Sequence, residues 1–203
     1  MRCFLSALLL AAALPAAAAR TVLVLGDSLS AAYNMDVQHG WVALLQQRLK
    51  QQDLPYNVVN ASISGDTTAG GLARLPRLLA QHRPQVVIVE LGGNDGLRGL
   101  PPEETRRNLS AIVARSRAAG AKVLLLGVQL PPNYGTRFNE RFQRAYRDVA
   151  AEYDVPLVPF VLEGVATDPA FMQPDGIHPN AAAQPRILEN VWPPLARLLA
   201  RGS

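Results

Sequence analysis

Cysteine is almost absent from this sequence of 203 residues, which contains only Cys3. Cys3 lies in an N-terminal segment that we expect to be removed, so the remaining chain offers no disulfide, no thiolate metal ligand and no thiol nucleophile. The fold must then be held together by its apolar core. A chain of this length can build one, because a domain of about 150 residues already buries roughly 68–70% of its unfolded surface.

Histidine is also scarce, and the whole chain contains three: His39, His82 and His178. No two of them have the spacing of a local metal site, and zinc would lack cysteine ligands. His82 stands at the end of an expected helix, where a cation compensates the helix dipole. The sequence also lacks a dinucleotide fingerprint and a phosphate-binding loop. We therefore expect neither a metal ion nor a cofactor.

No apolar run is long enough to span a bilayer comfortably, although residues 4–14 form an apolar stretch behind Arg2. Residues 17–19 are alanines, the small side chains that a signal peptidase requires. Residues 1–19 are therefore interpreted as a secretory signal that is cleaved before Arg20, with the protein reaching the periplasm. The alternative, a retained membrane anchor, is disfavoured by the short apolar stretch. Cleavage leaves a single domain over residues 20–203.

The excess of positive charge is small, with 20 basic and 16 acidic residues and a formal net charge of +4. One helical face gathers basic residues at spacings of four, three and three: Arg137, Arg141, Arg144 and Arg147. Glu140 and Asp148 lie on or near that face, which favours a solvated helix over a nucleic-acid groove. We expect no nucleic-acid partner, no membrane insertion once the signal is removed, and a monomer.

Short runs of β-branched and aliphatic residues alternate with longer segments of helical period along the rest of the chain. The runs that predict strands are residues 22–25, 56–61, 86–91, 122–128 and 156–160. The segments that predict helices are residues 40–52, 68–81, 102–119 and 138–153. Repeated βα units of this kind indicate an α/β fold with a mostly parallel sheet and helices on both faces.

The last part of the chain is rich in proline, with Pro179, Pro185, Pro193 and Pro194 after His178. Each proline removes a backbone donor. We expect a broken terminal helix there, in which Pro193 and Pro194 end or kink whatever the preceding residues begin.

Polar, glycine-rich segments follow the expected strands. Residues 26–28 follow the first strand, 62–66 the second and 92–95 the third, while the fifth leads through a loop to Asp175 and His178. Open parallel sheets bind ligands outside the carboxyl ends of their strands, where the strand order reverses. With the flavodoxin-like five-stranded order 2-1-3-4-5, which we expect here, the first three segments converge on one crevice.

Ser28 is the candidate nucleophile in this crevice. It follows the apolar run at residues 22–25 through a tight turn, and a helix N-terminus behind it would favour developing negative charge. Asp175 stands three residues before His178, and Gly176 lets the chain turn between them. The carboxylate can therefore orient one imidazole nitrogen and leave the other as base. Taken alone, Ser28 is more typical of a turn or a helix cap.

Gly65 and Asn94 are candidate donors to an oxyanion. The missing Cβ of Gly65 lets a backbone N–H approach the reacting oxygen closely, although glycine is also the ordinary residue wherever φ is positive. The side-chain amide of Asn94 can supply another N–H, although asparagine is common in turns. Neither residue identifies a site by itself.

The joint occurrence of these residues carries more information. All stand at expected strand ends or in the loop after the last strand, in this order along the chain: Ser28, Gly65, Asn94, Asp175 and His178. In this respect the chain resembles the GDSL, or SGNH, hydrolase family over nearly all of its length after the signal. It is most similar to the bacterial periplasmic thioesterase, arylesterase and lysophospholipase group, through intact motifs at residues 26–31, 91–96 and 175–180. The α/β-hydrolase motif G-x-S-x-G is absent, because Ser30 replaces its second glycine.

The resemblance implies a three-layer α/β/α fold and a serine carboxylic ester hydrolase. Ser28 would be the nucleophile, His178 the base and Asp175 its orienting acid. The backbone N–H groups of Ser28 and Gly65, with the side chain of Asn94, would form the oxyanion hole. The implied substrates are fatty acyl esters and thioesters, cleaved through an acyl-enzyme on Ser28.

Several residues near the expected site are candidates for an acyl channel: Tyr33, Leu130, Pro131, Asn133, Tyr134, Phe171, Met172 and Ile177. In the resembled group, the region at residues 130–135 contacts the acyl chain. The alternative is that these residues only close the core beneath a long loop. Two other functions stay open, a carbohydrate O-acetylesterase and a non-catalytic periplasmic binding module. A pure binder, however, has no need of Asp175 three residues before His178.

Overall fold

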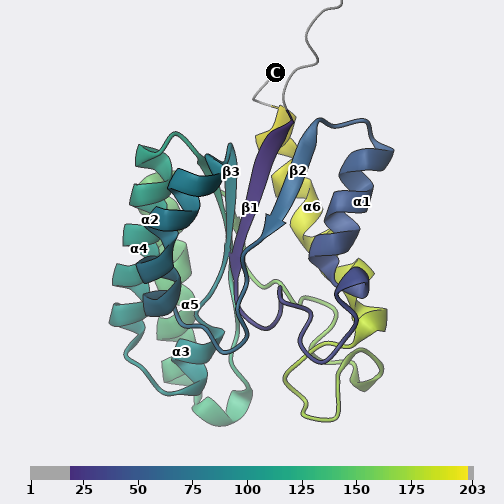
Figure 1. Cartoon of the computed structure of the whole chain (residues 1–203). Helices are drawn as coiled ribbons and strands as arrows, with labels where there is room; N and C mark the ends of the chain where they lie inside the picture. Colours follow the sequence, from purple (N-terminus) through teal and green to yellow (C-terminus); the bar gives the residue numbers. More distant parts are fainter. Residues whose placement is uncertain (1–18, 201–203) are drawn as a thin grey trace, which may run out of the picture.

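Five parallel strands form one sheet in the computed structural model, which describes residues 19–200. The strands are β1 (Arg20–Gly26), β2 (Tyr56–Asn60), β3 (Val86–Glu90), β4 (Lys122–Leu126) and β5 (Leu157–Val158). They lie in the order β2-β1-β3-β4-β5, so the predicted order 2-1-3-4-5 is confirmed. Figure 1 labels the first three strands of this order. Apart from Ala19, the segment interpreted as a signal lies outside the described residues.

Helices cover both faces of the sheet, which gives the three layers that the family resemblance implied (Figure 1). One face packs against α1 (Trp41–Gln51) and α6 (Gln184–Ala200). The other packs against α2 (Thr68–His82), α4 (Pro102–Ala118) and α5 (Thr136–Tyr153). Because side chains alternate along a strand, Val22 and Val24 enter the first core and Leu23 and Leu25 the second. Burial on both faces explains why the central strands are continuously apolar.

The terminal helix corrects a sequence-based expectation. α6 is one helix that contains Pro193 and Pro194, whereas the sequence predicted that the terminal helix would be broken. A proline inside a helix costs about 3 kcal/mol. Each large apolar side chain that α6 buries contributes roughly 1.5–3 kcal/mol, and its buried face includes Ile187, Leu188, Val191, Leu195 and Leu199. Burial in the core therefore outweighs the local penalty.

Two connections near the carboxyl ends of the strands also differ from prediction. A short helix, α3 (Gly93–Leu97), forms where the sequence predicted only a loop. Residues 28–35 form turns and a bend, so no helix N-terminus stands directly behind Ser28. The positive φ angles of Ala32 (57°) and Asn34 (54°) are incompatible with a helix there. Further short 3-10 helices are η1 (Val37–His39), η2 (Pro132–Tyr134), η3 (Pro169–Phe171) and η4 (Ala181–Ala183).

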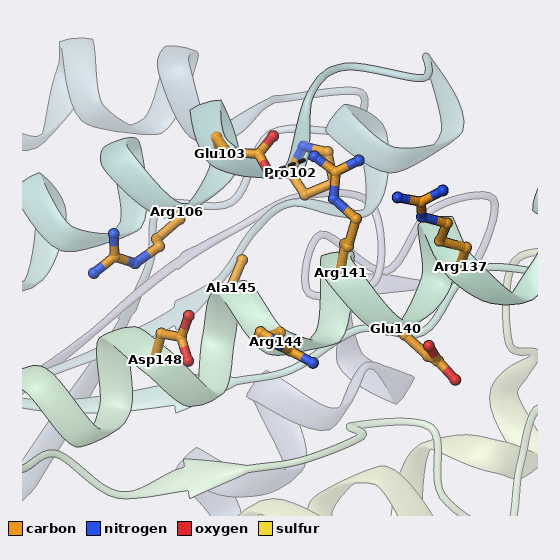
Figure 2. A pocket seen from close by; sticks show the side chains of 9 residues that line it. All are labelled: Pro102, Glu103, Arg106, Arg137, Glu140, Arg141, Arg144, Ala145 and Asp148. Atoms are coloured by element: carbon orange, nitrogen blue, oxygen red, sulfur yellow. Dashed lines mark hydrogen bonds and ion pairs between the residues drawn. The ribbon is translucent and has the colours of Figure 1, made fainter.

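Helix α5 lies beside α4 and forms two exposed ion pairs with it, one of them from its basic face. Arg141 of α5 contacts Glu103 of α4 at 2.6 Å (Figure 2), and Arg106 of α4 contacts Glu152 of α5 at 2.9 Å. Exposed pairs of this kind contribute little to stability, because water and salt screen the two charges. The groove between the two helices therefore carries mixed charge on solvated faces. Within residues 19–200, no helix combines the length and the apolar character needed to cross a bilayer.

Candidate active site

Ser28, His178 and Asp175 form a continuous chain of side-chain contacts. The Oγ atom of Ser28 lies 2.9 Å from Nε2 of His178, although the two residues are 150 positions apart in the sequence. Nδ1 of His178 lies 2.7 Å from Oδ2 of Asp175. Ser28 stands just beyond the end of β1, and the other two residues lie on the loop between η3 and η4. The arrangement can pass a proton from the serine oxygen to the imidazole while the carboxylate stabilises the resulting cation.

The loop around His178 is shaped by its own hydrogen bonds. Oδ1 of Asp175 accepts the backbone N–H groups of Ile177 (2.9 Å) and His178 (3.0 Å), which leaves Oδ2 for the imidazole. Gly176 has a φ of 66°, which suits glycine and closes the turn. Although desolvation by burial acts in the opposite direction, these hydrogen bonds lower the pKa of Asp175 to about 2. Asp175 is therefore ionised at any practical assay pH.

The loop that carries Ser28 packs against the histidine loop. The ring of Tyr33 lies against the imidazole of His178, with 4.4 Å between the ring centroids. The side chain of Gln173 donates to the backbone oxygen of Tyr33 at 2.9 Å and accepts from Asn34 at 3.1 Å. These contacts join two segments that are far apart in the sequence and hold the serine beside the histidine.

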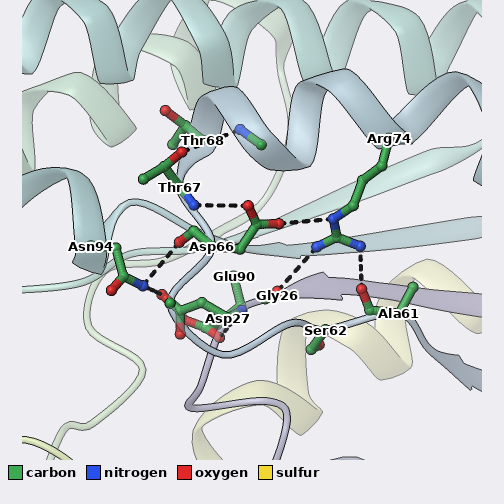
Figure 3. Close-up of polar contacts among 12 residues, drawn as sticks. Gly26, Asp27, Ala61, Ser62, Asp66, Thr67, Thr68, Arg74, Glu90 and Asn94 are labelled. Carbon is green, nitrogen blue, oxygen red and sulfur yellow. Dashed lines mark hydrogen bonds and ion pairs between the residues drawn. The ribbon is translucent and has the colours of Figure 1, made fainter.

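Asn94 lies where the loops after β1, β2 and β3 converge (Figure 3). Its Nδ2 atom donates to Oδ2 of Asp27 at 3.0 Å and to the backbone oxygen of Asp66 at 2.9 Å. The loop that contains Gly65 is tied to the end of β1 by a hydrogen bond from the Ile63 N–H to the Gly26 backbone oxygen at 3.1 Å. The structure thus brings together the three loops that the sequence placed in one crevice.

Two buried carboxyl groups lie next to this crevice, and sequence reasoning missed their pairing. Oε2 of Glu90 accepts the hydroxyl of Ser30 at 2.8 Å and the backbone N–H of Asp27 at 3.3 Å. Burial raises the pKa of Asp27 to about 6. Burial raises the pKa of Glu90 well above its usual range, and the negative charge of Asp27 raises it further. The only signal for Glu90 in the sequence was an acidic residue at the end of an apolar strand.

A hollow of about 420 Å³ opens beside Ser28, Asn94 and His178. Predicted channel residues that line it are Leu130, Pro131, Met172 and Ile177. Predicted channel residues outside its lining are Tyr33, Asn133, Tyr134 and Phe171. Apolar lining residues that the sequence reasoning did not single out include Leu29, Leu97, Val128, Phe160 and Leu162. Several of these lie within a few positions of a strand end or a motif residue, which is the signal that could have found them.

Two of the residues outside the lining have other roles. The hydroxyl of Tyr134 donates to the backbone oxygen of Leu97 at 3.0 Å, and its ring packs against the core formed with α5. Phe171 packs against the core on the opposite face of the sheet. Both side chains therefore close the core beneath the loops, as the alternative interpretation of the sequence had it. No metal-binding cluster of three His, Cys, Asp or Glu side chains is found among the described residues.

Comparison with known proteins agrees with this geometry. A model of the GDSL-like Lipase/Acylhydrolase family matches residues 24–185. The chain belongs to this family. This GDSL-like hydrolase is 62% identical over 183 residues to Esterase TesA of Pseudomonas aeruginosa, which covers 90% of this chain and 91% of the relative.

A second relative of this GDSL-like hydrolase is Thioesterase 1/protease 1/lysophospholipase L1 of Escherichia coli K12. The two are 54% identical over 174 residues, which covers 86% of this chain and 82% of the relative. A similar solved structure is esterase EstA from Pseudoalteromonas sp., inhibited by monoethylphosphonate, with a TM-score of 0.85 and 40% identity over 89% of this chain and 99% of that one. Membership of this family and the similarity to these relatives identify the protein as a serine ester hydrolase.

Proposed function

We propose that this hydrolase cleaves fatty acyl esters and thioesters through an acyl-enzyme on Ser28. The observation that carries the proposal is the contact chain from Ser28 Oγ through His178 to Asp175, at 2.9 Å and 2.7 Å. The serine oxygen attacks the acyl carbon while Nε2 of His178 takes its proton, and Asp175 stabilises the imidazolium. The imidazolium then returns the proton to the leaving alcohol or thiol. Water then attacks the acyl carbon while His178 takes its proton, and the imidazolium returns that proton to Oγ of Ser28 as the acid leaves.

The negative charge that develops on the carbonyl oxygen needs donors that are already in position. We assign this role to the backbone N–H groups of Ser28 and Gly65 and to Nδ2 of Asn94. Both hydrogens of Nδ2 have protein acceptors in the structure, on Asp27 and Asp66. The oxyanion must therefore share one of these hydrogens with its protein acceptor.

The hollow beside Ser28 supports an acyl chain as the part of the substrate that is recognised. It has a volume of about 420 Å³ and an apolar lining that includes Leu130, Phe160 and Met172. Each methylene that enters such a site contributes about 0.8 kcal/mol. The name of the Escherichia coli relative, which includes thioesterase and lysophospholipase, agrees with a fatty acyl group.

Lengthening the acyl chain should raise kcat/KM of the purified protein in a series of p-nitrophenyl esters from acetate to decanoate. Since about 1.4 kcal/mol is a tenfold change, each buried methylene should add up to about fourfold until the hollow is filled. The series is measured under conditions that keep every ester monomeric. A preference for acetate over all longer esters would instead favour the carbohydrate O-acetylesterase.

Two methionine variants test whether the acyl chain binds in the hollow beside Ser28. Met172→Ala removes apolar surface from the hollow and should lower kcat/KM several-fold for decanoate while leaving acetate nearly unchanged. Met35→Ala is the matched control, because Met35 is partly buried on the loop after β1 and lies outside the lining of the hollow. Equal loss for decanoate in both variants would show that the acyl chain does not occupy this hollow.

We also propose that the protein is exported to the periplasm and cleaved before Arg20. β1 begins at Arg20, so cleavage at that bond removes the segment before the fold and leaves the whole strand intact. Expression of the full chain in a Gram-negative host should give periplasmic protein whose N-terminal sequence starts at Arg20. Recovery of uncleaved protein in the membrane fraction would support the retained anchor instead.

A further inference from the structure

Arg74 of α2 is a partly buried arginine whose guanidinium contacts the end of β1 and two residues of the loop after β2 (Figure 3). Its Nε donates to Oδ2 of Asp66 at 2.8 Å. Its Nη2 donates to the backbone oxygen of Gly26 at 3.2 Å, and its Nη1 donates to the backbone oxygen of Ala61. The three nitrogens of the guanidinium thus donate to the last residue of β1, to the residue that follows β2 and to the loop after it.

Two of these contacts, those with Gly26 and Asp66, lead to donors of the proposed oxyanion hole. Gly26 stands two residues before Ser28, whose backbone N–H is one donor. Asp66 directly follows Gly65, whose backbone N–H is the second. The backbone oxygen of Asp66 also accepts from Nδ2 of Asn94, the third donor, at 2.9 Å. One side chain therefore joins the supports of all three donors without lining the hollow itself.

The carboxylate of Asp66 is held tightly between its partners. Oδ1 accepts the backbone N–H of Thr67 at 3.0 Å, while Oδ2 accepts from Arg74. A Cβ at position 70 would overlap Oδ1, so the glycine there leaves room for this carboxylate. The side chains of Arg74 and Asp66 are only 20% and 12% exposed, so water screens their attraction less than it would at the surface.

We propose that Arg74 is a positioning residue that presets the oxyanion hole, an inference that rests on the proposed function. An oxyanion hole works because its donors are fixed before the charge develops. The planar guanidinium can bond to Asp66 and to two backbone oxygens in one fixed geometry, whereas a lysine ammonium cannot reproduce that fork. Loss of the guanidinium leaves the hollow and the Ser28–His178 contact in place but lets the donors move.

The test measures kcat and KM of Arg74→Gln and Arg74→Lys with p-nitrophenyl hexanoate. Each kcat is calculated per reactive serine. A p-nitrophenyl alkylphosphonate counts those serines, since attack by Ser28 releases one nitrophenol per active protein and unfolded molecules release none. Removing one oxyanion donor costs about 10²–10³ in kcat, and we expect Arg74→Gln to lose at least about tenfold, with KM within about twofold. Arg74→Lys should fall between Arg74→Gln and the parent.

Arg77→Gln is the matched control. Arg77 lies on the same helix, is exposed and makes no hydrogen bond or ion pair to the described residues. Its kcat per reactive serine should equal that of the parent. A parent protein that releases no nitrophenol from the phosphonate would overturn the proposed function, and the role of Arg74 with it.

A double-mutant cycle with Asn94→Ala separates positioning of the hole from a general structural role. Asn94→Ala alone should lower kcat by about 10²–10³. If Arg74 acts by positioning Asn94 and its neighbours, Arg74→Gln should cost at least about threefold less in the Asn94→Ala background than in the parent. The same fold loss in both backgrounds, or an unchanged kcat per reactive serine in Arg74→Gln, overturns the proposal.

Discussion

Ser28→Ala should lower kcat for p-nitrophenyl hexanoate by on the order of 10⁶, the cost of losing the nucleophile of a serine triad. Alanine has no oxygen to attack the ester, so the covalent route is lost. The hollow and the other donors stay in place, and the variant should therefore still bind substrate. The measurement is steady-state ester hydrolysis, with the phosphonate titration confirming that no reactive serine is present.

Ser62→Ala is the matched control for this variant. The Oγ of Ser62 is buried near the end of β1 and has no hydrogen-bond partner among the described residues. Removing it deletes a nearby hydroxyl without touching His178, so kcat should stay within about twofold of the parent, as expected for a change away from the reacting groups. Unchanged hydrolysis by Ser28→Ala would end the proposed mechanism.

Asp175→Asn should lower kcat by up to about 10⁴ through the tautomer of His178 rather than through misfolding. In the parent, Oδ1 of Asp175 accepts two backbone N–H groups and Oδ2 faces Nδ1 of the imidazole. An asparagine that keeps the two backbone bonds must turn its NH₂ group toward Nδ1. The proton of the neutral imidazole then moves to Nε2, which faces Ser28 and can no longer accept its proton.

Asp168→Asn controls for the loss of a carboxylate from the same region. Asp168 accepts the N–H of Ala170 at 2.9 Å, and the oxygen of asparagine can do the same, so activity should be unchanged. The pH profile of the parent adds a second check. Because the pKa of Asp175 is about 2, its charge stays constant between neutral and weakly acidic pH, and this carboxylate should add no step to the profile in that range. A kcat for Asp175→Asn close to that of the parent would contradict the role given to this carboxylate.

Local patterns were sufficient to predict the sheet. The apolar runs that became β1, β3 and β4 lie between helical segments of ordinary length, and parallel βα units leave few ways to arrange five strands. The terminal helix was mispredicted because the penalty for Pro193 and Pro194 is local, whereas the gain comes from residues packed in the distant core. Helix propensity alone cannot compare the local proline penalty with the stabilisation gained in the core.

In the candidate site, too, local sequence patterns predicted the motif residues but not the residues that hold them in place. Ser28, Asn94 and the Asp175/His178 pair stand in recognisable short patterns, so the sequence could nominate them. Glu90 contacts Ser30 and Asp27, which are 60 and 63 positions away.

Arg74 likewise reaches Gly26 from 48 positions away, and in the sequence it resembles an ordinary charged residue on a helix. Such supports become visible only when the strands have been brought side by side. The residues that hold the reacting groups were therefore harder to predict than the reacting groups themselves.

The central claim, that the oxygen of Ser28 carries the acyl group, is tested most directly by mass spectrometry after treatment with a p-nitrophenyl alkylphosphonate. The account predicts one adduct per molecule, on the peptide that contains Ser28, with esterase activity lost in proportion to labelling. Complete inhibition with the adduct on another residue, or full activity in protein labelled at Ser28, would contradict it.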